Sequence, residues 1–237
     1  MNYLYELHLH TAETSKCGQS SAADMIKALA DKGISGTVVT DHFVNANARV
    51  DRDAPWHEQI DQILEGYRQA VIAGQTYGVQ VFLGWEYFAD WKDYVTFGPD
   101  ESFLYEHPEL AALDPLSYSR LIHKHGGFII HAHPYREAWY TPEEKWGVIV
   151  PGAHDAIEVF NGGNSEERFN QSAFQYAADR RELMTAGSDT HAVETTGSGL
   201  MAFPRRLDSV QDLICALRAD EGQRLIRPEL PLSANSC

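Results

Sequence analysis

The chain alternates between short apolar segments and stretches of helical periodicity along almost its whole length. Each apolar segment is followed by a polar turn and then by apolar residues spaced three and four apart. Strands that alternate with helices in this way typically build a parallel sheet from βα units. A chain of 237 residues is long enough for one large core. We therefore predict an α/β protein with a single domain over 1–237 and a short flexible tail from about 232.

The predicted elements follow the chain in order. Strands are expected at 3–9, 36–42, 79–88, 93–98, 128–134, 156–161, 182–191 and 199–204. Helices are expected at 22–33, 57–78, 115–127, 165–181 and 210–220, with Ser21 and Ser209 as N-caps. The carboxyl ends of parallel strands lie at one rim of a barrel, where active-site residues collect.

Histidines and acids stand at the ends of most of these strands. They are His8 and His10, Asp41 and His42, Glu86, His131 and His133, Asn161, and Asp189 and His191. Because strand side chains alternate, His8 and His10 should share one face, with Leu7 and Leu9 opposite. A mixture of imidazoles and carboxylates suits zinc, manganese or iron. We predict a metal centre that activates water for hydrolysis, with no catalytic group from the protein beyond that water.

Composition restricts the partners. The 34 acidic residues against 19 basic ones give a formal charge of −15, which opposes broad electrostatic binding to nucleic acid or an anionic membrane. The three cysteines form no CxxC pair, which favours a reducing compartment. No apolar run approaches the roughly 18 residues of a membrane span. We expect a cytoplasmic protein with no membrane contact, a small phosphorylated substrate, and nucleic acid polymers as unlikely partners.

The strand-end motifs resemble the PHP family, named for polymerase and histidinol phosphatase domains. In order, the chain has H-x-H-T at 8–11, T-D-H at 40–42, G-x-E at 84–86, A-H-P at 132–134, E-V-F-N at 158–161 and G-S-D-x-H at 187–191. The resemblance implies a distorted TIM-like (β/α)7 barrel. It also implies two or three divalent metal ions (Zn, Mn or Fe) at the carboxyl rim and phosphoester hydrolysis as the activity.

The resemblance also implies which residues are metal ligands. His8, His10, Glu86 and Asp189 would surround one ion, and Glu86 would bridge to a second ion that His133 also holds. His42 and His191 would belong to a third ion. Asp41, beside His42, is a weaker candidate, because its default role is a cap or a hydrogen-bond partner of a ligand.

The stretch "HTAETSKCG" departs from the family pattern, in which the Asp of S-D-G or the His of P-H-G is a ligand of the third ion. Aligning Gly18 places Cys17 at the ligand position, whereas a looped-out turn presents Glu13. We favour Glu13, because a carboxylate matches the other ligands and Cys would shift the site toward zinc. Relatives often carry a further histidine before A-H-P. Asp93 is the best-placed candidate here, and His131 is equally consistent with a ligand and a non-ligand role.

On the substrate side, Arg136 follows A-H-P and could bind a phosphate bidentately, and Asn161 could hydrogen-bond the substrate or a ligand. The primary hypothesis is a metal-dependent phosphoesterase acting on a nucleotide, a sugar phosphate or a compound like histidinol phosphate. The alternatives are an amide or lactone hydrolase on the same metal rim and a non-catalytic metal-binding PHP domain. The sequence leaves the oligomeric state unknown.

Overall fold

The strands form one strongly curved sheet in the computed structural model, which describes residues 2–219 and 223–227. Within these residues the strand order is β7-β6-β5-β4-β3-β2-β1-β8-β9. The strands are β1 (Tyr3–Leu9), β2 (Gly36–Val39), β3 (Gln80–Ala89), β4 (Lys92–Phe97), β5 (Phe128–His131), β6 (Ala156–Asn161), β7 (Leu183–Gly187), β8 (Leu200–Phe203) and β9 (Arg224–Ile226). The tail expected from about 232 lies outside the described residues.

Six of these strands, β1 to β3 and β5 to β7, run parallel, and β4 is inserted antiparallel between β3 and β5. Asp90 and Trp91 connect β3 to β4 with φ of 49° and 63°, the backbone sign that tight two-residue hairpins require. A hairpin therefore replaces one βα unit. The barrel is a distorted TIM-like α/β barrel, as predicted.

The barrel closes where the segment that follows β7 lies beside the end of β1. Leu9 and Thr190 form a parallel bridge, and the amide of His10 donates to the carbonyl of Thr190 at 2.9 Å. At the other end of β1, β8 pairs antiparallel with Tyr3 to Tyr5. Closure is therefore confined to the carboxyl ends of β1 and β7.

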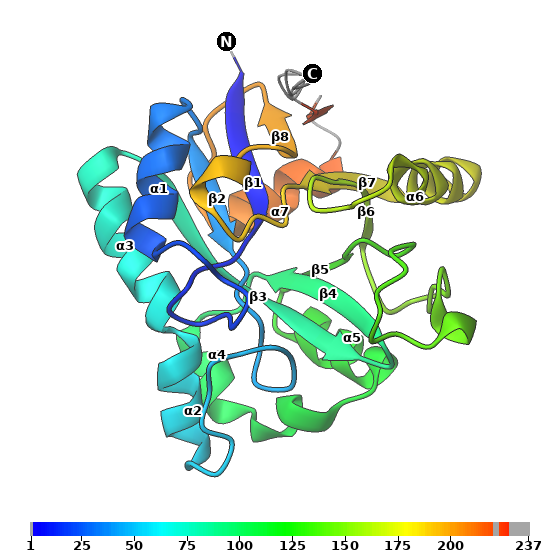
Figure 1. Cartoon of the computed structure of the whole chain (residues 1–237), viewed down its shortest axis with the longest axis horizontal. Coiled ribbons are helices and arrows are strands. Elements are labelled where there is room, and N and C mark those ends of the chain that lie inside the picture. The colour runs from blue at the N-terminus through cyan, green and yellow to red at the C-terminus, as the bar shows by residue number, and fades with distance from the viewer. Residues whose placement is uncertain (1, 220–222, 228–237) are drawn as a thin grey trace, which may run out of the picture.

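Helices cover the outside of the barrel. They are α1 (Ala22–Asp31), α2 (Trp56–Ile63), α3 (Glu65–Tyr77), α4 (Glu101–Glu106), α5 (Pro115–Lys124), α6 (Glu167–Arg180) and α7 (Val210–Ala219), with short 3-10 turns at Pro108–Ala112, Glu143–Lys145 and Val193–Thr195. Figure 1 shows α1 and α3 side by side on one flank, α2 and α4 below, and α6 extending from the opposite flank. The helix expected over 57–78 is interrupted at Leu64, which caps both α2 and α3.

The barrel core is apolar and draws on nearly every strand. Leu7, Val38, Val95 and Ile130 belong to it, together with the buried face of α7. Leu9 instead packs with α1 and α3. Leu7 and Leu9, expected on the same face of the strand, therefore pack in different clusters. The pairing of β1 with β2 shifts register between Glu6 and Leu9, and such an irregularity changes the direction of the side chains around it.

A buried hydrogen-bond chain fixes the β3–β4 hairpin against α5. The indole of Trp85 donates to the Tyr118 hydroxyl at 2.7 Å, and that hydroxyl donates to Thr96 Oγ1 at 2.7 Å. Trp85, Thr96 and Tyr118 are almost fully buried. The chain therefore ties both strands of the hairpin to one helix.

We expect Tyr118→Phe to lower the free energy of unfolding by about 1–3 kcal/mol, because it leaves a buried indole N–H without an acceptor. Urea unfolding followed by circular dichroism measures the change. Tyr77→Phe, at the exposed end of α3, is the matched control and should change stability by less than about 0.5 kcal/mol. Equal effects of the two substitutions would contradict the role given to Tyr118.

Candidate metal centre

Seven metal-ligand side chains converge at the closed end of the barrel. His8 lies in β1, Glu86 lies in β3, and the others follow the strand ends. Their ligand atoms form three overlapping groups, within each of which all atoms lie within 4.8 Å of one another: His8, His10 and Asp189; His8, Glu86 and His133; and His10, His42 and His191. The sequence-predicted ligands therefore come together, apart from Glu13.

Three nitrogens of this cluster face carboxylates without forming hydrogen bonds. His8 Nε2 lies 3.2 Å from Glu86 Oε1, His10 Nε2 lies 3.3 Å from Asp189 Oδ1, and His42 Nδ1 lies 2.9 Å from Glu86 Oε2. Within the described residues, none of these buried nitrogens has a hydrogen-bond partner of suitable geometry. Buried polar atoms are normally paired with a hydrogen-bond partner. Imidazole nitrogens and carboxylate oxygens whose lone pairs point into the same space are suited to bind a divalent cation. The residues fit metal ions.

Protons balance the buried charge when no cation is bound. Burial opposes ionisation of His8, but Asp189, Glu158 and Glu86 outweigh it and raise its pKa well above the usual range. Burial, with His191 and His42 nearby, lowers the pKa of His10 to about 3. Metal binding must displace protons from such a cluster, so its affinity should fall at low pH.

Glu158 orients His8 and was missed in the sequence. Its Oε1 lies 3.0 Å from His8 Nδ1, and its Oε2 accepts the backbone N–H of His133 at 2.9 Å. A carboxylate at Nδ1 holds the proton there and leaves Nε2 free to bind a metal. The available signal was an acid in the middle of a buried strand, since Glu158 is 3% exposed.

Asp41 acts behind the cluster. It accepts hydrogen bonds from the Thr11 amide at 2.7 Å, from the Thr11 hydroxyl at 2.7 Å and from the Ser15 hydroxyl at 2.6 Å. Ser15 Oγ in turn lies 3.1 Å from His10 Nδ1. Asp41 is therefore placed to support His10 through Ser15, and it is not a member of the converging groups.

Two of the converging residues have strained backbones. His133 has φ of 28° and Asp189 has φ of 51°. Residues other than glycine seldom adopt a positive φ. Asp189 is also held by Arg136, whose Nη2 lies 2.7 Å from Asp189 Oδ2. Such strain persists where the surroundings fix the conformation, and it is concentrated at functional sites.

The loop after His10 contradicts the preference for Glu13 over Cys17 as a ligand of the third ion. Both carboxylate oxygens of Glu13 accept the backbone N–H of Ala22, at 3.1 and 2.9 Å, at the first residue of α1. Glu13 therefore caps a helix and lies apart from the histidines. Cys17 lines the cleft with His42 and His191. Burial raises the pKa of Cys17, but its side-chain contacts with those two histidines outweigh burial and lower it to about 6.

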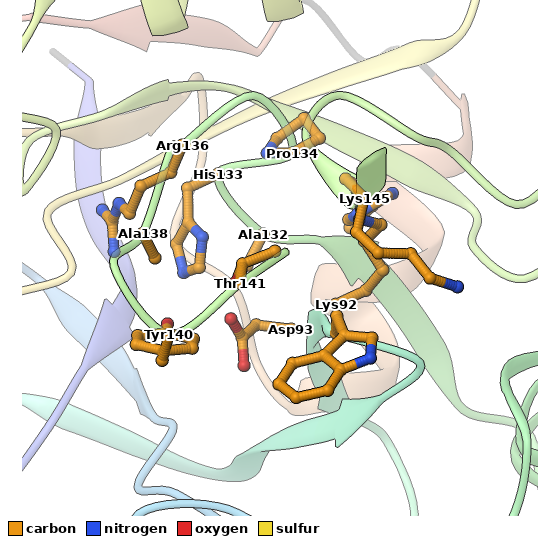
Figure 2. A pocket seen from close by; sticks show the side chains of 12 residues that line it. Lys92, Asp93, Ala132, His133, Pro134, Arg136, Ala138, Tyr140, Thr141 and Lys145 are labelled. Carbon is orange, nitrogen blue, oxygen red and sulfur yellow. Dashed lines mark hydrogen bonds between the residues drawn. The ribbon is translucent and has the colours of Figure 1, made fainter. Parts of the chain in front are cut away.

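A cleft of about 530 Å³ opens onto the cluster, and Arg136, Asp93, Tyr140 and Trp139 line it with the histidines. Burial and the neighbouring Glu86 raise the pKa of Asp93 to about 6. In Figure 2, the ring of His133 and the carboxylate of Asp93 face one another, with Tyr140 beside them.

Asn161 and Asn164 position Arg136. Asn161 Oδ1 accepts from Arg136 Nη2 at 2.7 Å, and Asn164 Oδ1 accepts from Nε at 2.9 Å. Asn161 also donates to Glu158 at 2.7 Å. Asn161 therefore links the arginine to the carboxylate behind His8.

His131 lies outside the converging groups. It is fully buried, and its ring packs against Tyr94 and His154 with centroid distances of 5.1 and 5.7 Å. Within the described residues its two ring nitrogens have no hydrogen-bond partner. It borders a small cavity of about 20 Å³ that adjoins the cleft and shares Asp93, His133 and Arg136 with it. Because His131 is not a member of the groups that could hold an ion, the structure favours the non-ligand role.

Comparison with known proteins finds two kinds of similarity, to a family model and to solved structures. The model of a family described as PHP-associated matches residues 167–221. No curated protein matches the chain. A two-domain protein from Bacteroides vulgatus, which contains a predicted PHP-like metal-dependent phosphoesterase, has a similar fold, with a TM-score of 0.66 and 15% identity over 96% of this chain and 65% of that chain. Together the family match and the fold support the PHP family.

Other proteins with this PHP-like fold differ in what they act on. Endonuclease Q, solved with a 27-mer duplex that carries an abasic lesion at the active site, has a TM-score of 0.63 and 12% identity over 94% of this chain and 58% of that chain. An amidohydrolase from Chromobacterium violaceum, solved with bound sulfate, has a TM-score of 0.55 and 15% identity over 94% of this chain and 98% of that chain. The chain thus spans less than two thirds of the Bacteroides protein and of endonuclease Q.

Endonuclease Q corrects the prediction that nucleic acid polymers are unlikely partners. That prediction rested on the net charge of −15, which describes the whole surface. The charge inside one cleft is set by its own lining groups, such as Arg136, and by any cations held there. Among the described residues, no helix is long and apolar enough to cross a membrane.

We expect Glu158→Gln to weaken metal binding by roughly 10–100-fold. The amide can donate to His8 Nδ1 and so favour the tautomer in which Nε2 carries the proton. Competition with a chromophoric chelator measures the affinity. Glu167→Gln is the control. Glu167 is the first residue of α6 and forms an exposed ion pair with Arg227, so this variant should bind metal as the native protein does. Native affinity in Glu158→Gln would refute the orienting role.

Proposed function

We propose that this protein is a metal-dependent phosphoesterase. The observation that carries the proposal is the convergence of seven imidazoles and carboxylates, five of them buried, in which three nitrogens, His8 Nε2, His10 Nε2 and His42 Nδ1, lack a hydrogen-bond partner among the described residues. The Bacteroides protein with a similar fold contains a predicted PHP-like metal-dependent phosphoesterase, which supports the proposal. Two or three divalent ions, zinc, manganese or iron, would be held by His8, His10, His42, Glu86, His133, Asp189 and His191.

Cations at this position supply Lewis acidity toward a phosphoryl oxygen and promote the ionisation of water. The chain contributes the geometry. Glu86 reaches three histidines, with its Oε1 3.2 Å from both His8 and His133 and its Oε2 2.9 Å from His42, so it is placed to bridge two ions. Asp93 faces the same space and could accept a proton there.

Arg136 is the group that favours a phosphate over a neutral substrate. Its Nε donates to Asn164 and its Nη2 donates to Asn161, and Nη2 also forms an ion pair with Asp189. Nη1 makes no hydrogen bond to the described residues, and the side chain borders the cleft. A fixed guanidinium with a remaining donor binds a phosphoryl oxygen at little cost in side-chain ordering.

The cleft volume of about 530 Å³ falls within the range of pockets that hold small ligands. We propose a phosphorylated compound of nucleotide or sugar-phosphate size as the first substrate class to test. Because endonuclease Q was solved with a DNA duplex that carries an abasic lesion, we include such duplexes in the same screen.

An amide or lactone hydrolase is the second candidate, because an amidohydrolase shares the fold. The same metal rim could polarise a carbonyl oxygen. The two functions differ in their need for Arg136, since a neutral carbonyl substrate carries no charge for the guanidinium to neutralise.

The direct test is hydrolysis that depends on both metal and ligands. Protein stripped with a chelator and reloaded with zinc, manganese or iron is assayed against nucleotides, sugar phosphates, histidinol phosphate and duplex DNA with an abasic site. We expect reloading to restore phosphoester cleavage in the native protein but not in Asp189→Asn, which retains the shape of the side chain. Metal-independent cleavage, or full activity in Asp189→Asn, would contradict the proposal.

Arg136→Lys separates the two functions. Lysine keeps a positive charge beside Asp189 but loses the planar fork. We expect kcat/KM for phosphoesters to fall by roughly 10–100-fold, as when a charge-assisted hydrogen bond is lost. Turnover of amides or lactones, if present, should change little. Arg180→Lys on α6 is the control, and equal losses for both substrate classes would argue against phosphate binding by Arg136.

A further inference from the structure

A buried lysine lies at the carboxyl rim of the barrel without an acidic partner. Lys92 is the first residue of β4 and is 5% exposed. Because β4 runs antiparallel to β5, its first residue lies at the same rim as His131, the last residue of β5. The ammonium group donates to the backbone carbonyl of Lys145, and among the residues that the structure describes it forms no ion pair. Lysine is seldom buried in this way without a counter-charge.

Positive charge predominates around the cavity of about 20 Å³ that adjoins the cleft. The lysine, arginine and carboxylate side chains that line it are Lys92, Lys145, Arg136 and Asp93. Lys145 is paired with Asp90, and Arg136 is paired with Asp189. In the view of Figure 2, the two lysines lie on one side of the cavity and Arg136 on the other. The charge that lacks a partner is therefore that of Lys92.

His131 adds an unused donor to the same cavity. It is fully buried and lines the cavity, and neither of its ring nitrogens has a hydrogen-bond partner among the described residues. An imidazole carries at least one N–H, and an ammonium carries three, of which Lys145 accepts one from Lys92. Buried donors normally have acceptors. An anionic oxygen placed in this cavity would therefore satisfy groups from two neighbouring strands.

The position and the size of the cavity restrict what that oxygen belongs to. The cavity shares Asp93, His133 and Arg136 with the cleft, so one ligand can extend from the metal centre into it. A volume of about 20 Å³ accommodates about one water-sized atom. A carboxylate that places one oxygen there has one further oxygen to accommodate, whereas a phosphoryl group has more. The size favours a carboxylate over a second phosphate.

We propose that Lys92 and His131 bind a carboxylate of the substrate, so that the protein acts on phosphorylated compounds that also carry a carboxylate. The proposal rests on the proposed function, because it places the phosphate of the same substrate at the metal ions and Arg136. It narrows the substrate class, and it makes Lys92 a specificity-determining residue.

Phosphonates that the protein cannot hydrolyse test the proposal without requiring turnover. Zinc-loaded protein is titrated by calorimetry with 3-phosphonopropionate and with propylphosphonate, which has a methyl group in place of the carboxylate. Phosphonoacetate and 4-phosphonobutyrate, each with its alkyl analogue, cover other chain lengths. We expect the best carboxylate to bind roughly 10–100-fold more tightly than its analogue, as for a hydrogen bond between charged groups. We expect Lys92→Met to remove this difference.

Lys27→Met is the matched control. Lys27 is an exposed residue of α1 that pairs with Asp31, so this variant should keep the native preference for the carboxylate. If Lys92 served only to anchor the loop at Lys145, Lys92→Met would weaken the binding of both kinds of phosphonate equally, and that result would overturn the proposal.

A crystal structure replaces the variant if Lys92→Met does not fold. Native crystals are soaked with zinc and the phosphonate that binds best. We expect its carboxylate within hydrogen-bond distance of Lys92 Nζ. A carboxylate that lies in solvent or on the metal ions would overturn the proposal.

The outcomes separate this inference from the proposed function. Equal affinity for the two kinds of phosphonate in the native protein would overturn the carboxylate site and leave phosphate binding intact. A preference that persists in Lys92→Met would also overturn it. Propane-1,3-diphosphonate that binds more tightly than 3-phosphonopropionate, and only with Lys92 present, would assign the cavity to a second phosphate instead. Failure of every phosphonate to bind would count against both the carboxylate site and the phosphoesterase.

Discussion

The parallel pairing of Leu9 with Thr190 is the constraint on which the site depends. It joins the first strand of the barrel to the segment after β7, and so brings together residues about 180 positions apart along the chain. His8 and His10 flank Leu9, and Asp189 and His191 flank Thr190. A single closure therefore sets the distances within the centre, and the Glu6 carboxylate strengthens it by accepting the amides of both His8 and Ser188, at 3.0 and 2.9 Å.

The buried charges at the closed end of the barrel determine which ions can bind there. Glu86, Glu158 and Asp189 are each less than 10% exposed, and buried carboxylates are costly unless cations or hydrogen bonds compensate them. Arg136 compensates part of the charge of Asp189, and its nearness holds the pKa of that carboxyl well below the usual range despite burial. The remaining charge faces imidazole nitrogens, an arrangement suited to divalent cations.

Much of the fold and of the site could be predicted from the sequence, because the residues that matter stand at strand ends. Strand-end position brought out His8, Glu86, His133 and Asp189, and the family resemblance implied that they are metal ligands. Glu158 was missed because it lies inside a strand and acts through His8. The bulge in β1 depends on pairing with β2, which alternation within one strand does not encode.

The choice between Glu13 and Cys17 shows why the rest was not predictable. It depends on how the loop between β1 and α1 turns, and the sequence does not reveal that the Glu13 carboxylate would bind the start of α1. Net charge failed as a guide to partners for a related reason, since it averages over the whole surface and does not describe the charge of a single cleft.

Anomalous diffraction from crystals grown with zinc, recorded on both sides of its absorption edge, tests the central claim most directly. We expect peaks that vanish below the edge at two or more positions among the seven converging side chains. One peak should lie between Glu86 and His133, and one beside His42 and His191. Crystals that show no anomalous peak at the cluster, with His8 and Glu86 still 3.2 Å apart, would contradict the account.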